Sequence, residues 1–452
     1  MISSVGLAVF PKVEPVDLNP LELAFCHWED HRAAAFRAVA LCRVDGFVES
    51  EFLEIALNRL QHRQPKLRAA VAQMSRGRSQ LRFEQDTPPI PFQIKDHAER
   101  EGPWREETRR LFETTFPEMG PLVAVTVLRS RAHDCSEMLV TIHHAIADGL
   151  SAAAVLDGLL SEYAIAESRQ DAPPRPPLNP VRVVRAKSSG GWSARIWLLR
   201  RLWRIQREQR RSPQTQLPAA LDVPPQSQWV RWVFSPTESS LLLQRCKGEQ
   251  TSLRAALAAA ACCGLMDCLP VPRGSFKCQY PFDVRAMLVT TSTRLTLEDM
   301  GCFATIANDF YEVPQQPVFW DVARHTYEGI KTFVQHGGPA FYYNMAARLS
   351  KLSSMMNTST SGSESTAEIS GDRPTVVISN FGVLNIQEEY GSLRPTGCAF
   401  LFKHDGIGPS LMLHSLVMGA QLHISFSADR LDPTFWDRLH CAVLGHLKAA
   451  IR

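Results

Sequence analysis

Two adjacent histidines are the residues in this sequence whose type and spacing most clearly allow chemistry. They stand in the stretch "MLVTIHHAIADGLSAAAVL" (138–156), where His143 and His144 end an apolar run and Asp148 and Gly149 follow. Two titratable rings at the end of an apolar strand cost free energy unless they are partnered or used. Three interpretations of the motif therefore need comparison.

The first interpretation makes His143, His144 and Asp148 metal ligands. Imidazole and carboxylate are suitable ligands, but a closed site usually needs four groups. No further His or Cys pair stands nearby at ligand spacing, and adjacent side chains of a strand point to opposite faces. We therefore predict no metal. The second interpretation treats both histidines as satisfied structural residues, and it is disfavoured because Asp148 and Gly149 complete a four-position pattern.

The third interpretation is general-base catalysis. A histidine at a strand end, where the chain turns, can present one ring nitrogen to a cavity. The glycine after the aspartate lets backbone or substrate approach closely. A neutral imidazole there would take the proton from an alcohol or amine as it attacks an activated acyl group. Chemistry of this type needs neither a metal nor a covalent enzyme intermediate, and we favour this interpretation.

The elements that would position the motif alternate between strand and helix patterns. The strand patterns cover 36–44, 122–130 and 137–142. The helix patterns cover 50–71, with Ser50 as a plausible N-cap, and 149–164. This alternation is typical of an α/β protein.

A Pro-rich stretch, "DAPPRPPLNP" (171–180), interrupts the alternation, which resumes near Trp229. The later part predicts a helix at 251–269 with Thr251 as its N-cap, strands at 276–288 and 375–384, and a last strand and helix within 421–447. The Ser/Thr-rich stretch 353–372 is expected to be a mobile loop.

Length and composition bound the protein class. A chain of 452 residues suggests two halves, and we predict an N-terminal subdomain at 1–170, a linker at 171–228 and a C-terminal subdomain at 229–452. The chain is 45% apolar and 21% charged, as in soluble globular proteins, and its formal charge of +3 does not indicate nucleic acid. The 11 scattered cysteines favour reduced, buried thiols. No signal peptide or membrane span is evident, so a cytoplasmic location is expected.

The segment "WSARIWLLRRLWRIQREQRR" (192–211) reads as a basic amphipathic helix with seven arginines and one glutamate. We expect it to pack its tryptophans on the body of the protein and to leave its arginines in water. The alternative is that the helix contacts a membrane surface or an acidic partner.

The stretch "HHAIADG" (143–149) resembles the HHxxxDG signature of the condensation-domain-like acyltransferase superfamily. That superfamily includes nonribosomal peptide condensation domains, polyketide-associated acyltransferases, alcohol acetyltransferases and wax ester synthases. The order and spacing of elements follow the family over nearly the whole chain. The resemblance implies two chloramphenicol-acetyltransferase-like subdomains with an active-site tunnel between them. It also implies that His144 is the catalytic base, supported by His143 and Gly149.

Two segments of the second half extend the resemblance. In the family, the motif aspartate pairs with an arginine from the second half, and "YPFDVRAML" (280–288) nominates Arg285 as the partner of Asp148. The segment "ISNFGVL" (378–384) resembles a channel-facing element and nominates Ser379, Asn380 and Gly382 as substrate-channel residues. A turn at a strand end explains this second segment about as well.

Departures from the family limit the assignment to a branch. The "DFGWG" element of the plant-type acyltransferases is absent, and "HWED" (27–30) is only a faint echo of the wax ester synthase motif. In "DMGCFATIAND" (299–309), Cys302 replaces an asparagine that is often found after the glycine, so no role is carried onto it. We expect it to be a buried structural thiol.

The sequence therefore predicts an acyltransferase that moves an acyl group from a thioester to a hydroxyl and forms an ester. The thioester, on coenzyme A or on the phosphopantetheine of an acyl carrier protein, is a co-substrate, and no resident cofactor is expected. Two alternatives remain. One is amide-forming condensation or cyclisation in a nonribosomal peptide pathway, and the other is a non-catalytic member that binds a carrier protein.

Overall fold

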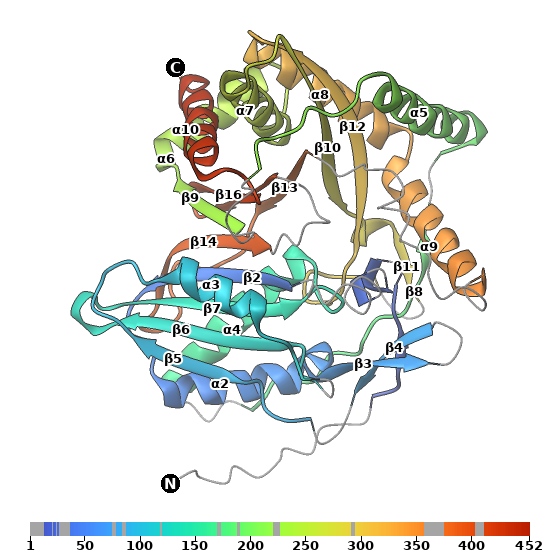
Figure 1. Ribbon diagram of the computed structural model, residues 1–452. Coiled ribbons are helices and arrows are strands. Elements are labelled where there is room, and N and C mark those ends of the chain that lie inside the picture. The colour runs from blue at the N-terminus through green and yellow to red at the C-terminus, as the bar shows by residue number, and fades with distance from the viewer. Residues whose placement is uncertain are drawn as a thin grey trace.

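The computed structural model describes residues 13–19, 21–23, 25–26, 37–74, 78–83, 87–117, 120–169, 173–187, 190–219, 227–290, 294–356, 375–402 and 411–452. Two large sheets, each covered by helices, lie one above the other in Figure 1. The predicted α/β class with two subdomains is confirmed.

The first sheet carries the histidine motif on a central strand. Its strand order is β14-β2-β7-β6-β5. The strands are β2 (Arg37–Asp45), β5 (Phe92–Asp96), β6 (Val123–Ser130), β7 (Cys135–His143) and β14 (Arg394–Phe402). Every residue of β7 is buried, because α2 (Ser50–Arg63) and α4 (Gly149–Glu167) pack on one face of the sheet and α3 (Trp104–Glu113) packs on the other. Burial on both faces accounts for the apolar run that leads into the histidines.

The second sheet has the strand order β12-β10-β13-β15-β16-β9. Its strands are β9 (Ser227–Val233), β10 (Arg273–Asp283), β12 (Ala304–Pro314), β13 (Val376–Val383), β15 (Leu411–Met418) and β16 (Gln421–Asp429). The helices of this half are α6 (Pro236–Gly248), α7 (Leu253–Cys268), α8 (Phe319–Gln335), α9 (Gly338–Met356) and α10 (Pro433–Ala449). Helix α7 is buried along nearly its whole length between neighbours that include α8 and α10, as expected for a helix that is apolar all round.

Two small sheets are described besides the two large ones. One has the order β1-β4-β3 and is formed by β1 (Val16–Asp17), β3 (Ala69–Met74) and β4 (Arg78–Phe83). The other pairs β8 (Val183–Ala186) with β11 (Leu288–Thr290). Strand β8 lies inside the predicted linker and β11 inside the second half, so the linker is joined to that half by strand pairing.

Strand β14 connects the two parts of the chain. It comes from the later part of the sequence but pairs antiparallel with β2, with Phe402 opposite Ala38. Because Arg37 of β2 lies opposite His143 of β7, the end of β14 is brought next to the histidines. The first sheet is thus built from both sides of the predicted boundaries, which themselves stay a prediction.

Several element bounds differ from those predicted. Helix α2 ends at Arg63 and is followed by a 3₁₀ turn at Pro65–Arg68 and by β3, because proline cannot continue a helix. Its N-cap is Glu49 rather than Ser50, without a side-chain hydrogen bond. Helix α7 is capped by Ser252 rather than Thr251. Most of the predicted mobile loop at 353–372 lies outside the described residues, and residues 353–356 belong to α9.

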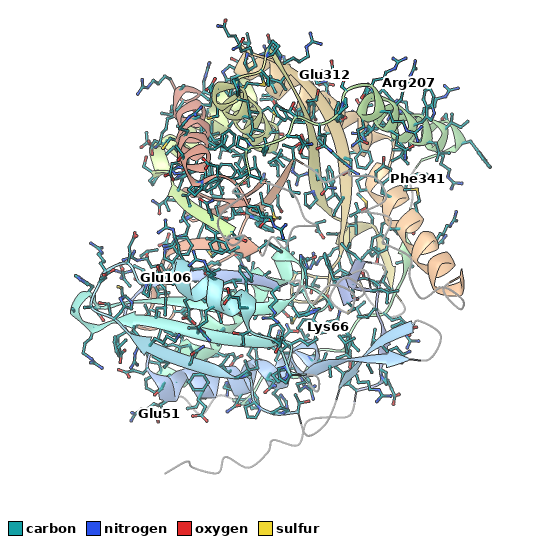
Figure 2. All side chains as sticks on the ribbon, viewed as in Figure 1. Glu51, Lys66, Glu106, Arg207, Glu312 and Phe341 are labelled. Atoms are coloured by element: carbon teal, nitrogen blue, oxygen red, sulfur yellow. The ribbon has the colours of Figure 1, made fainter. Side chains whose placement is uncertain are left out.

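Helix α5 (Trp192–Arg211) has the predicted bounds, but its tryptophans are not all packed on the body. Trp192 and Trp203 are 80% and 62% exposed, whereas Arg201 is buried. The helix lies at the edge of the second half, and Figure 2 shows Arg207 on its outer side. The expectation that tryptophans face inward and arginines face water is therefore wrong for these residues.

Most cysteines and the long apolar helix α4 are buried in the cores of the protein. All eleven cysteines are free, and only Cys441 is exposed. Within the part of the chain that the structure describes, α4 is the single unbroken helix long and apolar enough to cross a membrane, and α6 and α7 pass the same test only as a sharply bent pair. More than half of α4 is buried in the first core, as is typical of a core helix.

Candidate active site

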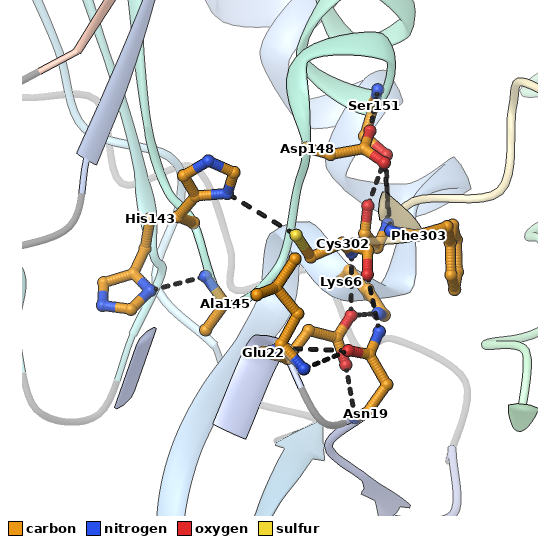
Figure 3. Close-up of polar contacts among 12 residues, drawn as sticks. Asn19, Glu22, Lys66, His143, Ala145, Asp148, Ser151, Cys302 and Phe303 are labelled. Carbon is orange, nitrogen blue, oxygen red and sulfur yellow. Dashed lines mark hydrogen bonds and ion pairs between the residues drawn. The ribbon is translucent and has the colours of Figure 1, made fainter. Parts of the chain in front are cut away.

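The motif occupies the turn between β7 and α4. Strand β7 ends at His143, whose ring is buried and whose Nδ1 accepts a hydrogen bond from the Ala145 N–H at 3.0 Å (Figure 3). The edge of this ring also faces Phe116. His143 therefore stabilises the turn through its ring. Its side chain and that of His144 point to opposite sides, because adjacent strand positions alternate.

The ring of His144 lies between aromatic side chains from two separate segments. It stacks on Phe25 with 4.2 Å between ring centroids and is tilted against Phe402 of β14 at 5.2 Å. Nδ1 of His144 lies 3.8 Å from Sγ of Cys302 (Figure 3). The ring also hydrogen-bonds the backbone of His144 and Ala147.

Burial lowers the pKa of His144 to about 4 and outweighs the nearby charge of Asp148, which raises it. The imidazole is consequently neutral at neutral pH, which is the form that a general base needs. The Cys302 thiol is buried beside it, and burial raises the pKa of that thiol well above its ordinary value. Cys302 is thus a thiol rather than a thiolate, in line with its expected structural character.

Asp148 and Arg285 form a buried ion pair across the two halves. Nη2 of Arg285 donates to Oδ1 of Asp148 at 2.8 Å, and both side chains are less than one-tenth exposed. The same Nη2 lies 2.8 Å from Oγ of Ser151. On its other side Arg285 donates from Nη1 to Asp283 at 2.9 Å.

The Asp148 carboxylate also caps α4. Its Oδ1 accepts from the Ser151 N–H at 2.8 Å and its Oδ2 accepts from the Phe303 N–H at 3.0 Å. Burial tends to raise the pKa of this carboxyl, but the charge and hydrogen bond of Arg285 and the two backbone donors hold it below its ordinary value. Asp148 is therefore an anion that fixes the turn.

The pairing of β10 with β12 explains why Arg285 and Phe303 meet the same carboxylate. Asp283 at the end of β10 lies opposite Ala304 at the start of β12. Arg285 follows one strand and Phe303 precedes the other, so both emerge at the same edge of the second sheet. The guanidinium of Arg285 also lies over the Phe303 ring, 4.9 Å from its centroid.

A buried polar cluster holds the chain at Cys302 from the other side. Glu22 accepts from Lys66 at 2.8 Å and from the Cys302 N–H at 3.0 Å. Nδ2 of Asn19 donates to the Cys302 carbonyl at 2.9 Å (Figure 3). The Glu22–Lys66 pair is almost fully buried, so the N-terminal segment fixes the residue that faces the histidine.

The segment around Ser379, Asn380 and Gly382 reaches the motif through a residue that the sequence analysis did not single out. Ser379 and Asn380 are half-buried on β13, and Oδ1 of Asn380 accepts from the Gly382 N–H at 2.9 Å, with Gly382 at a φ of +73°. Phe381 packs against Gly149 so closely that a Cβ there would stand 2.0 Å from its Cε1. The glycine of the motif is thus needed for contact between the halves.

Other parts of the site also escaped prediction. Two of these parts had a weak local hint: Ser151 stands three positions after the helix cap, and Asp283 stands two positions before Arg285. For Phe25 and Phe402, the sequence carried no signal beyond the residue type. The described residues hold no group of three or more His, Cys, Asp or Glu arranged for a metal ion.

A cavity of about 550 Å³ lies between the two halves. Its lining includes Arg43, Trp104, Arg231 and His423. His144 is not among the lining residues, so the tunnel at the histidine stays a prediction.

Comparison with known proteins places this geometry in a family. The family model of the condensation domain matches residues 23–267, which is more than half of the chain and includes the motif. No curated protein matches the sequence at a significant level.

Many solved structures share the fold. TRI3 trichothecene 15-O-acetyltransferase from Fusarium sporotrichioides is 12% identical, with a TM-score of 0.70 over 99% of this chain and 98% of that one. Polyketide synthase associated protein 5 from Mycobacterium tuberculosis is 17% identical, with a TM-score of 0.65 over 98% and 99%. The epimerization domain of the third module of tyrocidine synthetase B is also 17% identical, with a TM-score of 0.64 over 97% of each chain. At these identities the likeness shows the fold, while the family match covers the motif itself. The chain belongs to the condensation domain family.

Proposed function

We propose that this protein is an acyltransferase that moves an acyl group from a thioester to a hydroxyl acceptor, with His144 as general base. The observation that carries the proposal is the position of His144 in the turn between β7 and α4, which the buried Asp148–Arg285 pair fixes from the second half. The solved structures of the same fold include an O-acetyltransferase that overlays 99% of this chain.

The reaction moves one proton and exchanges one acyl bond. Nε2 of His144 takes the proton of the acceptor hydroxyl while its oxygen attacks the thioester carbonyl. The resulting tetrahedral intermediate breaks its C–S bond, and the imidazolium returns the proton to the departing thiolate. The products are an ester and a free thiol. The base requires the tautomer in which Nδ1 carries the ring hydrogen and Nε2 is unprotonated.

The ion pair has a positioning role in this proposal. Asp148 and Arg285 do not reach the reacting atoms; they fix the turn that presents His144. Ser379 and Asn380 remain candidates for the substrate channel, since they adjoin Phe381 and hence the motif. Donor and acceptor would be held next to each other, which supplies much of the rate advantage.

Mass spectrometry of the purified protein with a panel of acyl-CoAs and pooled alcohols and amines tests the proposal. An ester that is absent with His144→Ala supports it, and an amide instead would favour condensation. If no acyl-CoA reacts, the same assay is repeated with acyl groups loaded on a carrier protein. No product from either donor would contradict acyl transfer and would favour a carrier-binding role.

A further inference from the structure

Helix α5 exposes an apolar face that the fold does not cover. Trp192, Ile196, Leu199 and Trp203 are 80%, 46%, 54% and 62% exposed. Their spacings of four, three and four residues place all four on one side of the helix. We call these four residues the α5 face. Single exposed apolar residues are ordinary, but a contiguous row with two tryptophans indicates a surface that binds something.

The opposite side of α5 anchors the helix, so the orientation of the α5 face is fixed. Leu198 and Ile205 are buried. Arg201 is buried as well, and its Nη2 donates to Oδ2 of Asp309 on β12 at 2.8 Å. Trp197 stacks on His336 with 4.1 Å between ring centroids. The helix cannot turn its exposed tryptophans inward without breaking this buried ion pair.

Cations flank the α5 face on both sides. Six of the seven arginines of the helix are exposed, and Glu208 is its sole acidic residue. The exposed arginines are Arg195, Arg200, Arg204, Arg207, Arg210 and Arg211. The guanidinium of Arg207 lies over the Trp203 ring at 5.3 Å, and that of Arg195 lies over Trp192 at 5.8 Å. Figure 2 shows Arg207 pointing outward from the helix.

We propose that the α5 face docks on an anionic membrane surface, with the helix lying parallel to the bilayer. An apolar row with tryptophans, bordered by arginines and nearly free of acids, matches helices that lie in the lipid headgroup region. Indole rings suit this region because one edge is apolar and the other can donate a hydrogen bond. The arginines would meet lipid phosphates while their stems cover the apolar boundary. This docking does not depend on acyl transfer.

Co-sedimentation with vesicles tests the proposal. The full chain should bind vesicles of phosphatidylglycerol mixed with phosphatidylcholine and should bind pure phosphatidylcholine far more weakly, and high salt should reduce binding. Replacing two cations with Arg200→Gln/Arg207→Gln should weaken binding to the anionic vesicles by roughly 30-fold, because each basic residue near such a surface contributes about 1 kcal/mol. Trp192→Ser/Trp203→Ser should abolish the residual affinity at high salt.

Matched controls distinguish binding through the α5 face from non-specific binding through other exposed apolar or basic residues. Leu241→Ser/Leu243→Ser changes two exposed leucines of α6, and Arg245→Gln/Arg394→Gln removes two exposed cations elsewhere; both should bind like the wild type. His144→Ala should also bind normally, so loss of catalysis and loss of docking are distinguishable.

Three results would overturn the proposal. The first is the absence of binding at every lipid composition. The second is binding that survives both pairs of α5 substitutions. The third is occupation of the α5 face by a second copy of the chain. Sedimentation velocity without lipid addresses another occupant: concentration-dependent dimers that Trp192→Ser/Trp203→Ser dissolves would assign the face to a second copy of the chain and refute membrane docking.

Discussion

Removing either member of the Asp148–Arg285 pair should destabilise the whole fold as well as slow any reaction. In Asp148→Ala, Arg285 keeps a bond to Asp283, but it loses its buried anion, and the N–H groups of Ser151 and Phe303 lose their acceptor. Breaking a buried ion pair costs about 3–5 kcal/mol, and loss of an N-cap alone costs about 1 kcal/mol. We expect the free energy of unfolding to fall by about 3–5 kcal/mol.

Removing the arginine instead should lower the free energy of unfolding by a similar amount. Arg285→Ala leaves the Asp148 carboxylate buried with only its two backbone donors, and this variant should also lose about 3–5 kcal/mol. Arg285→Lys should lose less, about 1–3 kcal/mol, because one ammonium keeps the charge but cannot reproduce the arginine fork that spans Asp148 and Asp283.

Urea unfolding of the two single variants and the double variant measures these values, provided that the dependence on urea stays constant. The double-mutant cycle should give a coupling energy of about 2 kcal/mol or more. The Arg394–Glu389 pair is a matched control: it has the same 2.8 Å distance but both side chains are more than 60% exposed, so its coupling should be far smaller, because solvent screens the two charges. The reasoning would be refuted if Asp148→Ala and Arg285→Ala lowered the free energy of unfolding by less than the single variants of the control pair do. It would also be refuted if the effects of the two substitutions were additive in the cycle.

Three further predictions concern the motif glycine, the pH dependence of the reaction and the exposed thiol. Gly149→Ala should lose about 1–3 kcal/mol of stability and most activity, because its Cβ would stand 2.0 Å from Phe381 Cε1; Gly445→Ala in α10, where a Cβ meets nothing within 4 Å, should be neutral or stabilising in the same denaturation assay. The catalytic efficiency should stay level at neutral pH and fall only as the pH approaches 4, because the lowered pKa of His144 keeps the ring unprotonated above that value; a midpoint near 6.5 would contradict its burial. A maleimide should label one thiol quickly in the native protein, Cys441, and peptide mapping that finds other sites labelled at the same rate would contradict the buried thiols.

Local pattern in the sequence was sufficient for the elements with the strongest signals. Strands β2, β6 and β7 and helices α4 and α5 lie within a few residues of their predicted bounds, because each has a clear period or a continuous apolar run between breakers. The errors fall at element ends. Caps such as Ser252 depend on which of two neighbouring hydroxyls reaches a backbone N–H, and that geometry is not encoded in residue type alone.

Contacts between distant segments were beyond local pattern. Nothing in the residues around Phe402 indicates that β14 leaves the second half to pair with β2 and place that ring beside His144. Likewise, Phe25, Cys302 and Phe381 converge on the motif from three separate segments. The orientation of α5 was misjudged because an apolar stripe usually faces a core, whereas here the buried side is chosen by Leu198, Arg201 and Ile205.

The most direct test of the proposed catalytic role is the single-turnover rate of acyl transfer, measured for the wild type and for His144→Ala with the donor and acceptor that the mass-spectrometry screen identifies. The matched control is His133→Ala, which changes an exposed histidine just before β7. Circular dichroism checks that each variant is folded. The account predicts that His144→Ala slows transfer by roughly 10²–10⁴-fold while His133→Ala leaves it unchanged. A folded His144→Ala protein that transfers the acyl group at the wild-type rate would contradict it.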